Sequence, residues 1–137
     1  MVLKLIVAGG RDFKNFELLE REVEIFIDYI ISDPTLNITG IEIVSGKQVT
    51  KPDKNDESTW HGADYLGEKY AKLRGIRVKP FPADWNNLGK KAGHVRNEQM
   101  AVYANAAIVF WDGMSPGTGD MKELAEKYNL IHKTINY

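Results

Sequence analysis

Short apolar runs alternate with amphipathic segments along the whole of this 137-residue chain. Apolar residues in the amphipathic segments recur with a period near 3.6, which indicates helices, whereas the apolar runs are short enough to be buried strands. Strands that alternate with helices form a parallel sheet covered by helices on both faces. We therefore predict one α/β domain, residues 1–137, with a mainly parallel five-stranded sheet. The predicted strands are Leu3–Ala8, Ile41–Val44, Ile76–Phe81, Ala106–Trp111 and Ile131–Ile135.

Capping and stop residues mark the helices between these strands. Asn15 is expected to cap a helix that ends before Asp33. Gly75 is expected to stop a second helix, because glycine readily adopts the left-handed conformation found after a helix. A third helix is predicted around Arg96, and a fourth from about Asp120 to Tyr128.

Composition excludes several classes of function. The chain has no cysteine, so thiol redox catalysis, thiolate metal sites and disulfide scaffolds are excluded. His61, His94 and His132 lack the spacing of metal ligands, and neither a G-x-G-x-x-G nor a Walker A motif occurs. We expect no metal and no bound cofactor.

Charge and hydropathy bear on the partners of the chain. The apolar segment 1–8 is too short to span a membrane and has no signal-peptide cleavage pattern. The formal net charge of −1 argues against nucleic-acid binding driven by bulk electrostatics. We expect a cytoplasmic protein that has a small-molecule ligand, no membrane partner and no nucleic-acid partner.

Polar or glycine-rich residues follow four of the predicted strands. Ligands of parallel α/β sheets bind at the carboxyl ends of the strands. The sequence therefore predicts a ligand pocket built from these four segments. They are Gly9-Gly10-Arg11-Asp12, Ser45-Gly46, Pro82–Trp85 and Asp112-Gly113.

An Arg-Asn pair and a glycine-rich turn flank the strand Ala106–Trp111 and indicate a phosphate site. Arg96 and Asn97 are predicted in the first turn of a helix, where the positive end of the dipole disfavours a cation unless an anion lies nearby. The segment Ser115–Gly119 opens the next helix, where backbone N–H groups converge on phosphate. The candidate ligand-binding residues are Gly9, Gly10, Arg11, Ser45, Gly46, Asp64, Trp85, Arg96, Asn97, Asp112, Gly117 and Thr118.

Four of these candidates also have a purely structural interpretation. Asp64 lies near a helix start and is as well suited to capping as to binding a ribose. Asp112 precedes a glycine, as in many turns. Trp85 is suited to the core as well as to stacking on a base, and Arg11 to a surface ion pair as well as to an anion.

The segment Lys47–Glu57 has no periodic apolar positions to bury. Because it leaves the pocket end of a predicted strand, it is either a solvated insertion or a lid over the pocket. We expect it to be mobile.

Together these motifs resemble the YspA-like branch of the SLOG superfamily over nearly the whole chain. The resemblance implies a Rossmann-like fold, a nucleotide-derived ligand and a homodimer, with relatives in the cytokinin-activating phosphoribohydrolases and the DNA-processing protein DprA. Similar proteins often have a continuous Ser-Gly-Gly-Ala-Arg-Gly-Ala-Asp run, which Lys47 and the insertion interrupt here. The segments that carry the resemblance are Gly9–Phe13, Ser45-Gly46, His61–Asp64, Phe81–Trp85, Ala92-Gly93, Arg96-Asn97 with Met100, Phe110–Gly113 and Gly117-Thr118.

We consider three functions. The first is binding or sensing of a phosphate-containing nucleotide derivative, such as ADP-ribose or an NAD-derived molecule. The second is N-glycosidic cleavage with Arg96 and Asp120 as candidate catalytic residues. In the related phosphoribohydrolases a glutamate stands three residues after the threonine, where this chain has Met121, so Asp120 is shifted by about 100° on the helix. The third, single-stranded DNA binding, lacks interleaved basic and aromatic residues. Ser115 lies in a G-x-S-x-G pattern, but Pro116 has no N–H for an oxyanion hole.

Overall fold

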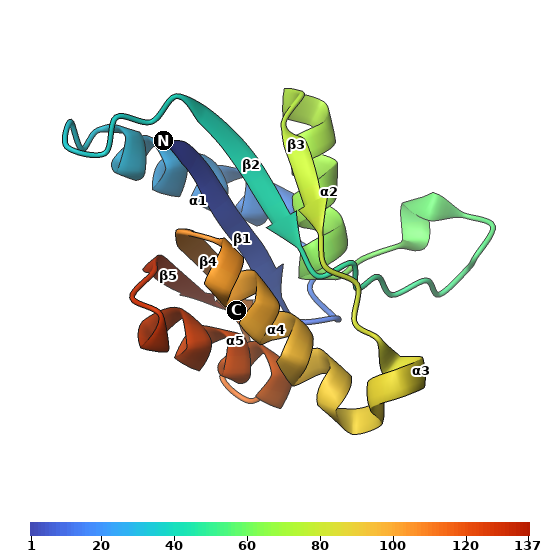
Figure 1. The fold of residues 1–137 in the computed structure, drawn as a ribbon. Helices are drawn as coiled ribbons and strands as arrows, with labels where there is room; N and C mark the ends of the chain where they lie inside the picture. The colour runs from blue at the N-terminus through green and yellow to red at the C-terminus, as the bar shows by residue number, and fades with distance from the viewer.

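All five strands of the sheet run parallel, as the sequence predicts. The computed structural model describes all residues 1–137. The strands are β1 (Val2–Gly9), β2 (Gly40–Ser45), β3 (Arg77–Pro80), β4 (Ala106–Trp111) and β5 (Ile131–Asn136), and they lie in the order β3-β2-β1-β4-β5 (Figure 1). The predicted fold class, an α/β domain of the three-layer Rossmann-like type, is confirmed.

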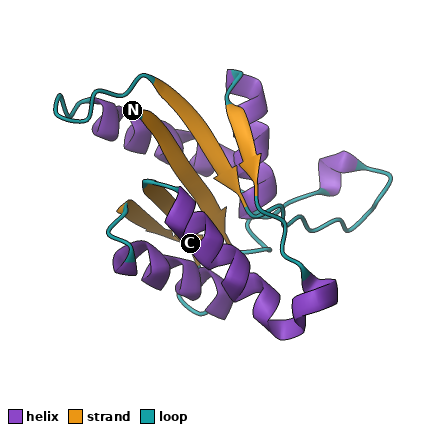
Figure 2. Cartoon of the chain, in the orientation of Figure 1, coloured by secondary structure: helices purple, strands orange, loops and turns teal.

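Helices cover both faces of the sheet (Figure 2). They are α1 (Phe16–Ile31), α2 (Ala63–Arg74), α3 (Trp85–Leu88), α4 (Ala92–Tyr103) and α5 (Pro116–Lys127). Single 3₁₀ turns at Glu57–Thr59 and Gly89–Lys91 complete the helical structure. None of the helices combines the length and the apolar character needed to cross a membrane.

The central strand β1 divides the core into two layers. Leu3, Leu5 and Val7 pack with α1 and α2, whereas Ile6 and Ala8 pack with α4 and α5. Successive side chains of a strand point to opposite faces, so one strand supplies both layers. This double burial accounts for the continuous apolar run at the start of the chain.

The predicted helix signals act as expected. The Asn15 side-chain oxygen accepts a hydrogen bond from the Leu18 N–H at 3.0 Å and so caps α1. Gly75 ends α2 with a left-handed φ of 66°. Both predictions are confirmed.

Two helix starts differ from the prediction. The helix after β4 begins at Pro116, not near Asp120, because Pro116 occupies the first helical position, where its missing N–H costs nothing. Helix α4 begins at Ala92, so Arg96 is its fifth residue and lies beyond the first turn. The dipole argument for an anion at Arg96 is therefore wrong. The sequence analysis predicts no helix at Trp85–Leu88, where the structure has α3.

Candidate functional site

A cavity of about 620 Å³ lies at the carboxyl ends of β1 and β4. Strand β1 leads to α1 on one face of the sheet and β4 leads to α5 on the other, so the two connections diverge and leave a crevice. Among the sequence candidates, Ser45, Gly46 and Asp112 do not line the cavity. The candidates that line it are Gly9, Gly10, Arg11, Asp64, Trp85, Arg96, Asn97, Gly117, Thr118 and Asp120.

Arg96 is buried in the wall of the cavity between two parts of the chain. Its Nε donates to Asn97 Oδ1 at 3.0 Å, and its Nη1 donates to the Gly46 carbonyl oxygen. Burial lowers the pKa of the guanidinium, and the nearby Asp64 carboxylate opposes that shift. The negative charge expected beside Arg96 is thus supplied in part by the protein itself.

Asp64 is the buried carboxylate of the site. Burial raises its pKa to about 6, although Arg96 and a hydrogen bond from the Gln48 N–H, at 3.1 Å, favour the charged form. Asp64 lies in the first turn of α2, but the hydrogen bond that its side chain accepts comes from Gln48 and not from an N–H group of α2. Asp64 instead ties the start of the Lys47–Glu57 segment to the cavity.

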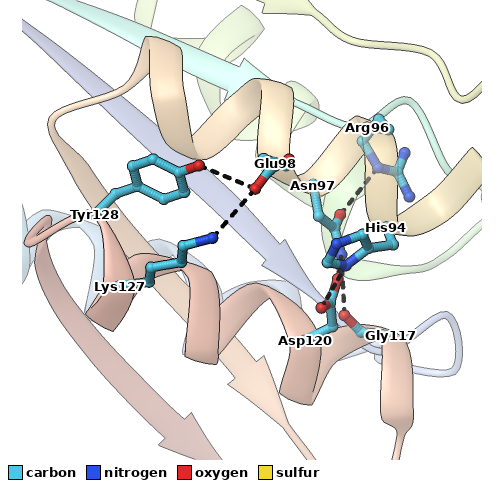
Figure 3. Close-up of polar contacts among 8 residues, drawn as sticks. All are labelled: His94, Arg96, Asn97, Glu98, Gly117, Asp120, Lys127 and Tyr128. Atoms are coloured by element: carbon cyan, nitrogen blue, oxygen red, sulfur yellow. Dashed lines mark hydrogen bonds and ion pairs between the residues drawn. The ribbon is translucent and has the colours of Figure 1, made fainter.

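Asn97 joins α4 to the first turn of α5 (Figure 3). Its Nδ2 donates to the Gly117 carbonyl oxygen at 3.2 Å and to Asp120 Oδ2 at 3.0 Å, while its Oδ1 accepts from Arg96. Both amide hydrogens are used within the protein. Asn97 is therefore placed to position the turn.

The first turn of α5 presents free hydrogen-bond donors to the cavity. The N–H groups of Gly117 and Thr118 donate no hydrogen bond within the protein. The Thr118 side chain is also without a hydrogen-bond partner, although Thr118 is only 7% exposed. The Thr118 hydroxyl is not a buried unsatisfied group but, like the two N–H groups, a donor that is open to the cavity and free for a ligand.

Asp112 shapes this turn from outside the cavity. Its carboxylate accepts hydrogen bonds from the N–H groups of Ser115 and Met114, at 2.8 and 2.9 Å, and these bonds hold its pKa below the usual value. Asp112 therefore acts as a turn residue and does not line the cavity.

Cationic and aromatic side chains complete the wall. Arg11 forms no ion pair within the protein and lies over the Trp85 ring, with its Cζ 5.9 Å from the ring centroid. Trp85 is 44% exposed, so it is not a core residue. Gly93 allows the indole to approach, because a Cβ there would lie 3.3 Å from Trp85 Cη2.

The carboxyl end of β2 is closed by internal contacts. The Ser45 hydroxyl donates to Glu68 Oε2 at 2.6 Å and accepts from the Lys47 N–H at 3.1 Å. Lys47 Nζ lies 2.7 Å from Glu68 Oε1. At the end of β1, the N–H of Gly10, another candidate ligand-binding residue, is also satisfied within the protein, because it donates to the Phe110 carbonyl oxygen at 3.1 Å.

The insertion reaches the cavity only at its start. Gln48, Val49 and Thr50 line the cavity, and the Thr50 hydroxyl donates to the Arg11 carbonyl oxygen at 2.9 Å. Thr50 also forms an isolated antiparallel bridge with His61. The mobility of the insertion stays a prediction.

Sequence reasoning missed two further groups that line the cavity. His94 Nδ1 lies 2.8 Å from Asp120 Oδ1 across α4 and α5 (Figure 3), and Lys90 lies on the 3₁₀ turn before α4. In the sequence, the spacing of His94 bears only on metal binding. Its partner is 26 residues away, a separation that no local motif reveals.

Comparison with models of protein families, with characterised proteins and with solved structures finds no significant match to this chain.

Proposed function

We propose that the protein binds a phosphate-containing nucleotide derivative in the cavity between β1 and β4. The observation that carries this proposal is the set of free donors at the start of α5, beside three cations. Gly117 and Thr118 offer two N–H groups and a hydroxyl, and a helix start favours an anion by its dipole. The cations that line the same cavity are Arg11, Lys90 and Arg96.

The rest of the cavity suits the nucleoside part of such a ligand. The half-exposed Trp85 ring offers a surface on which a base stacks. The Asp64 carboxyl group lines the same cavity, and its carbonyl oxygen accepts a hydrogen bond from a ribose hydroxyl even when the group is protonated. We assign the phosphate to the α5 end and the base to the α3 end. ADP-ribose, an NAD-derived molecule and a nucleoside phosphate all have this arrangement of groups.

The resemblance to the YspA-like branch of the SLOG superfamily supports the same ligand class. It also leads us to propose that the protein acts as a homodimer in the cytoplasm. N-glycosidic cleavage is the weaker alternative, because the Asp120 carboxylate already accepts from His94 and Asn97 and because Met121 is buried. Binding to single-stranded DNA is weaker still and predicts a steep loss of affinity with salt.

Calorimetry with ADP-ribose, AMP and adenosine tests the proposal. We expect ADP-ribose and AMP to bind and adenosine to bind more weakly, because adenosine lacks the phosphate. Thr118→Val removes one hydroxyl without changing the shape of the side chain, and it should weaken AMP binding by about 1 kcal/mol. Thr134→Val makes the same change on β5, outside the cavity, and is the matched control. Equal affinity for adenosine and AMP would contradict the phosphate site.

A further inference from the structure

His94 and Asp120 form a hydrogen-bonded pair at the edge of the cavity that phosphate binding does not require. His94 Nδ1 lies 2.8 Å from Asp120 Oδ1, and the imidazole is 58% exposed. An ionised carboxylate only accepts hydrogen bonds, so Nδ1 carries the proton. The neutral ring then has a free lone pair on Nε2, which is the arrangement of a general base oriented by a carboxylate.

The pair is held next to the free donors of α5. Asn97 Nδ2 donates both to Asp120 and to the Gly117 carbonyl oxygen, so the base and the donor turn belong to one network (Figure 3). The Thr118 hydroxyl makes no hydrogen bond within the protein and is accessible from the same wall of the cavity. With the phosphate on these donors, as proposed above, the electrophilic atom nearest to His94 would be phosphorus.

We propose that His94 acts as a general base in the hydrolysis of a nucleotide phosphoanhydride. Nε2 takes a proton from water, and the water oxygen forms a bond to phosphorus. The bond from phosphorus to the bridging oxygen breaks, its electron pair stays on that oxygen, and the proton held by His94 is returned to it. The cations that line the cavity, Arg11, Lys90 and Arg96, would stabilise the charge on the phosphoryl oxygens. This proposal rests on the proposed nucleotide binding.

ADP-ribose in ¹⁸O-labelled water provides the test. The products should be AMP and ribose 5-phosphate, with one ¹⁸O in a phosphate group and with no free adenine released. His94→Asn keeps a donor toward Asp120 but removes the base, and it should slow hydrolysis by about 10²-fold or more while ADP-ribose still binds. His132→Asn, an exposed histidine on β5 outside the cavity, should keep the parental rate.

Two further variants separate chemistry from structure. Added imidazole should restore part of the activity of His94→Ala, because the exposed side chain leaves room for it at the cavity edge. Asp120→Asn should lower kcat more than it changes KM, since Asp120 acts through His94 as a positioning residue.

Three outcomes would overturn this proposal. They are binding of ADP-ribose without hydrolysis, release of adenine without ¹⁸O in a phosphate group, and full activity of His94→Asn. The first would leave the proposed binding function intact, whereas failure of ADP-ribose and AMP to bind at all would contradict both proposals.

Discussion

The turn between β4 and α5 and the segment after β2 carry similar sequence signals but have opposite structures. Both place glycine and a hydroxyl side chain at the carboxyl end of a strand. After β4, the N–H groups of Gly117 and Thr118 face the cavity without partners. After β2, the Ser45 hydroxyl and the Lys47 N–H bond to each other, and Ser45 and Lys47 also contact Glu68.

The two turns differ because different side chains contact them. Asp112, from outside the cavity, and Asn97, from its wall, bond to the β4–α5 turn and leave its donors free. Glu68 on α2 faces the end of β2 and satisfies the polar groups there. A glycine-rich segment at a strand end is thus a ligand site only where no side chain of the protein has already satisfied it.

Arg96 links the two regions, and its loss should have the largest effect. Arg96→Ala removes the donor to the Gly46 carbonyl oxygen and leaves the buried Asp64 carboxylate without its main opposing charge. We expect the free energy of unfolding to fall by about 3 kcal/mol at pH 7, together with a loss of nucleotide binding. Urea denaturation measures the first effect. Arg11→Ala, which removes a cation without ion pairs, is the control, and a fall of similar size there would contradict this role of Arg96.

Ser45→Ala should separate stability from binding. It breaks the bonds to Glu68 and to the Lys47 N–H, so we expect the free energy of unfolding to fall by about 1–2 kcal/mol. The affinity for AMP should not change, because Ser45 does not line the cavity. Denaturation and calorimetry on the same preparation check both parts. Weaker AMP binding with unchanged stability would reverse the roles assigned to the two regions.

Asp64 should couple ligand binding to proton uptake. Its pKa of about 6 lies above the ordinary value of 3.8, and an anion bound nearby raises it further because the neutral acid repels no charge. Affinity for ADP-ribose should therefore be highest below about pH 6 and fall as the pH rises through that value. A further rise of about one unit on binding corresponds to a tenfold change in affinity.

Calorimetry in buffers with different ionisation enthalpies measures the proton uptake directly. Asp64→Asn should abolish the part of the uptake that is centred near pH 6. Equal uptake by this variant and the parent protein would assign the coupling to another group.

Gly117→Ala should have the smallest effect on stability, and it should raise the free energy of unfolding instead of lowering it. An added Cβ would meet nothing within 4 Å, so alanine is expected to stabilise the first turn of α5 by about 0.5 kcal/mol. The same Cβ should weaken AMP binding if phosphate approaches this backbone. Thermal unfolding and calorimetry measure the two changes. A variant that is more stable and binds AMP equally well would show that the ligand does not touch Gly117.

The fold was predictable because its signals are local. The strand Ala106–Trp111 is predicted to the residue, and Asn15 and Gly75 mark their helix ends by chemistry that needs no tertiary contact. The start of α5 was missed because Pro-Gly-Thr-Gly has a low helix propensity and helix formation there depends on the Asp112 turn.

The candidate site was predictable only in outline. The polar residues after the strands predict the correct edge of the sheet. Whether each polar group there is free or hydrogen-bonded within the protein depends on residues that are distant in the sequence. Glu68 closes the end of β2, and Asp120 orients His94, from 23 and 26 residues away. Hydrophobic periodicity does not predict contacts between residues so far apart in the chain. The roles of Ser45 and His94 could therefore not be predicted from the sequence.

A two-dimensional ¹H–¹⁵N NMR titration with AMP and with adenosine tests the central claim most directly. If the free donors of α5 hold phosphate, the amide resonances of Gly117 and Thr118 shift with AMP and much less with adenosine. The resonances of Gly46 and Lys47, at the closed end of β2, should stay nearly fixed with either compound. Shifts at Gly46 and Lys47 without shifts at Gly117 and Thr118 would contradict the account.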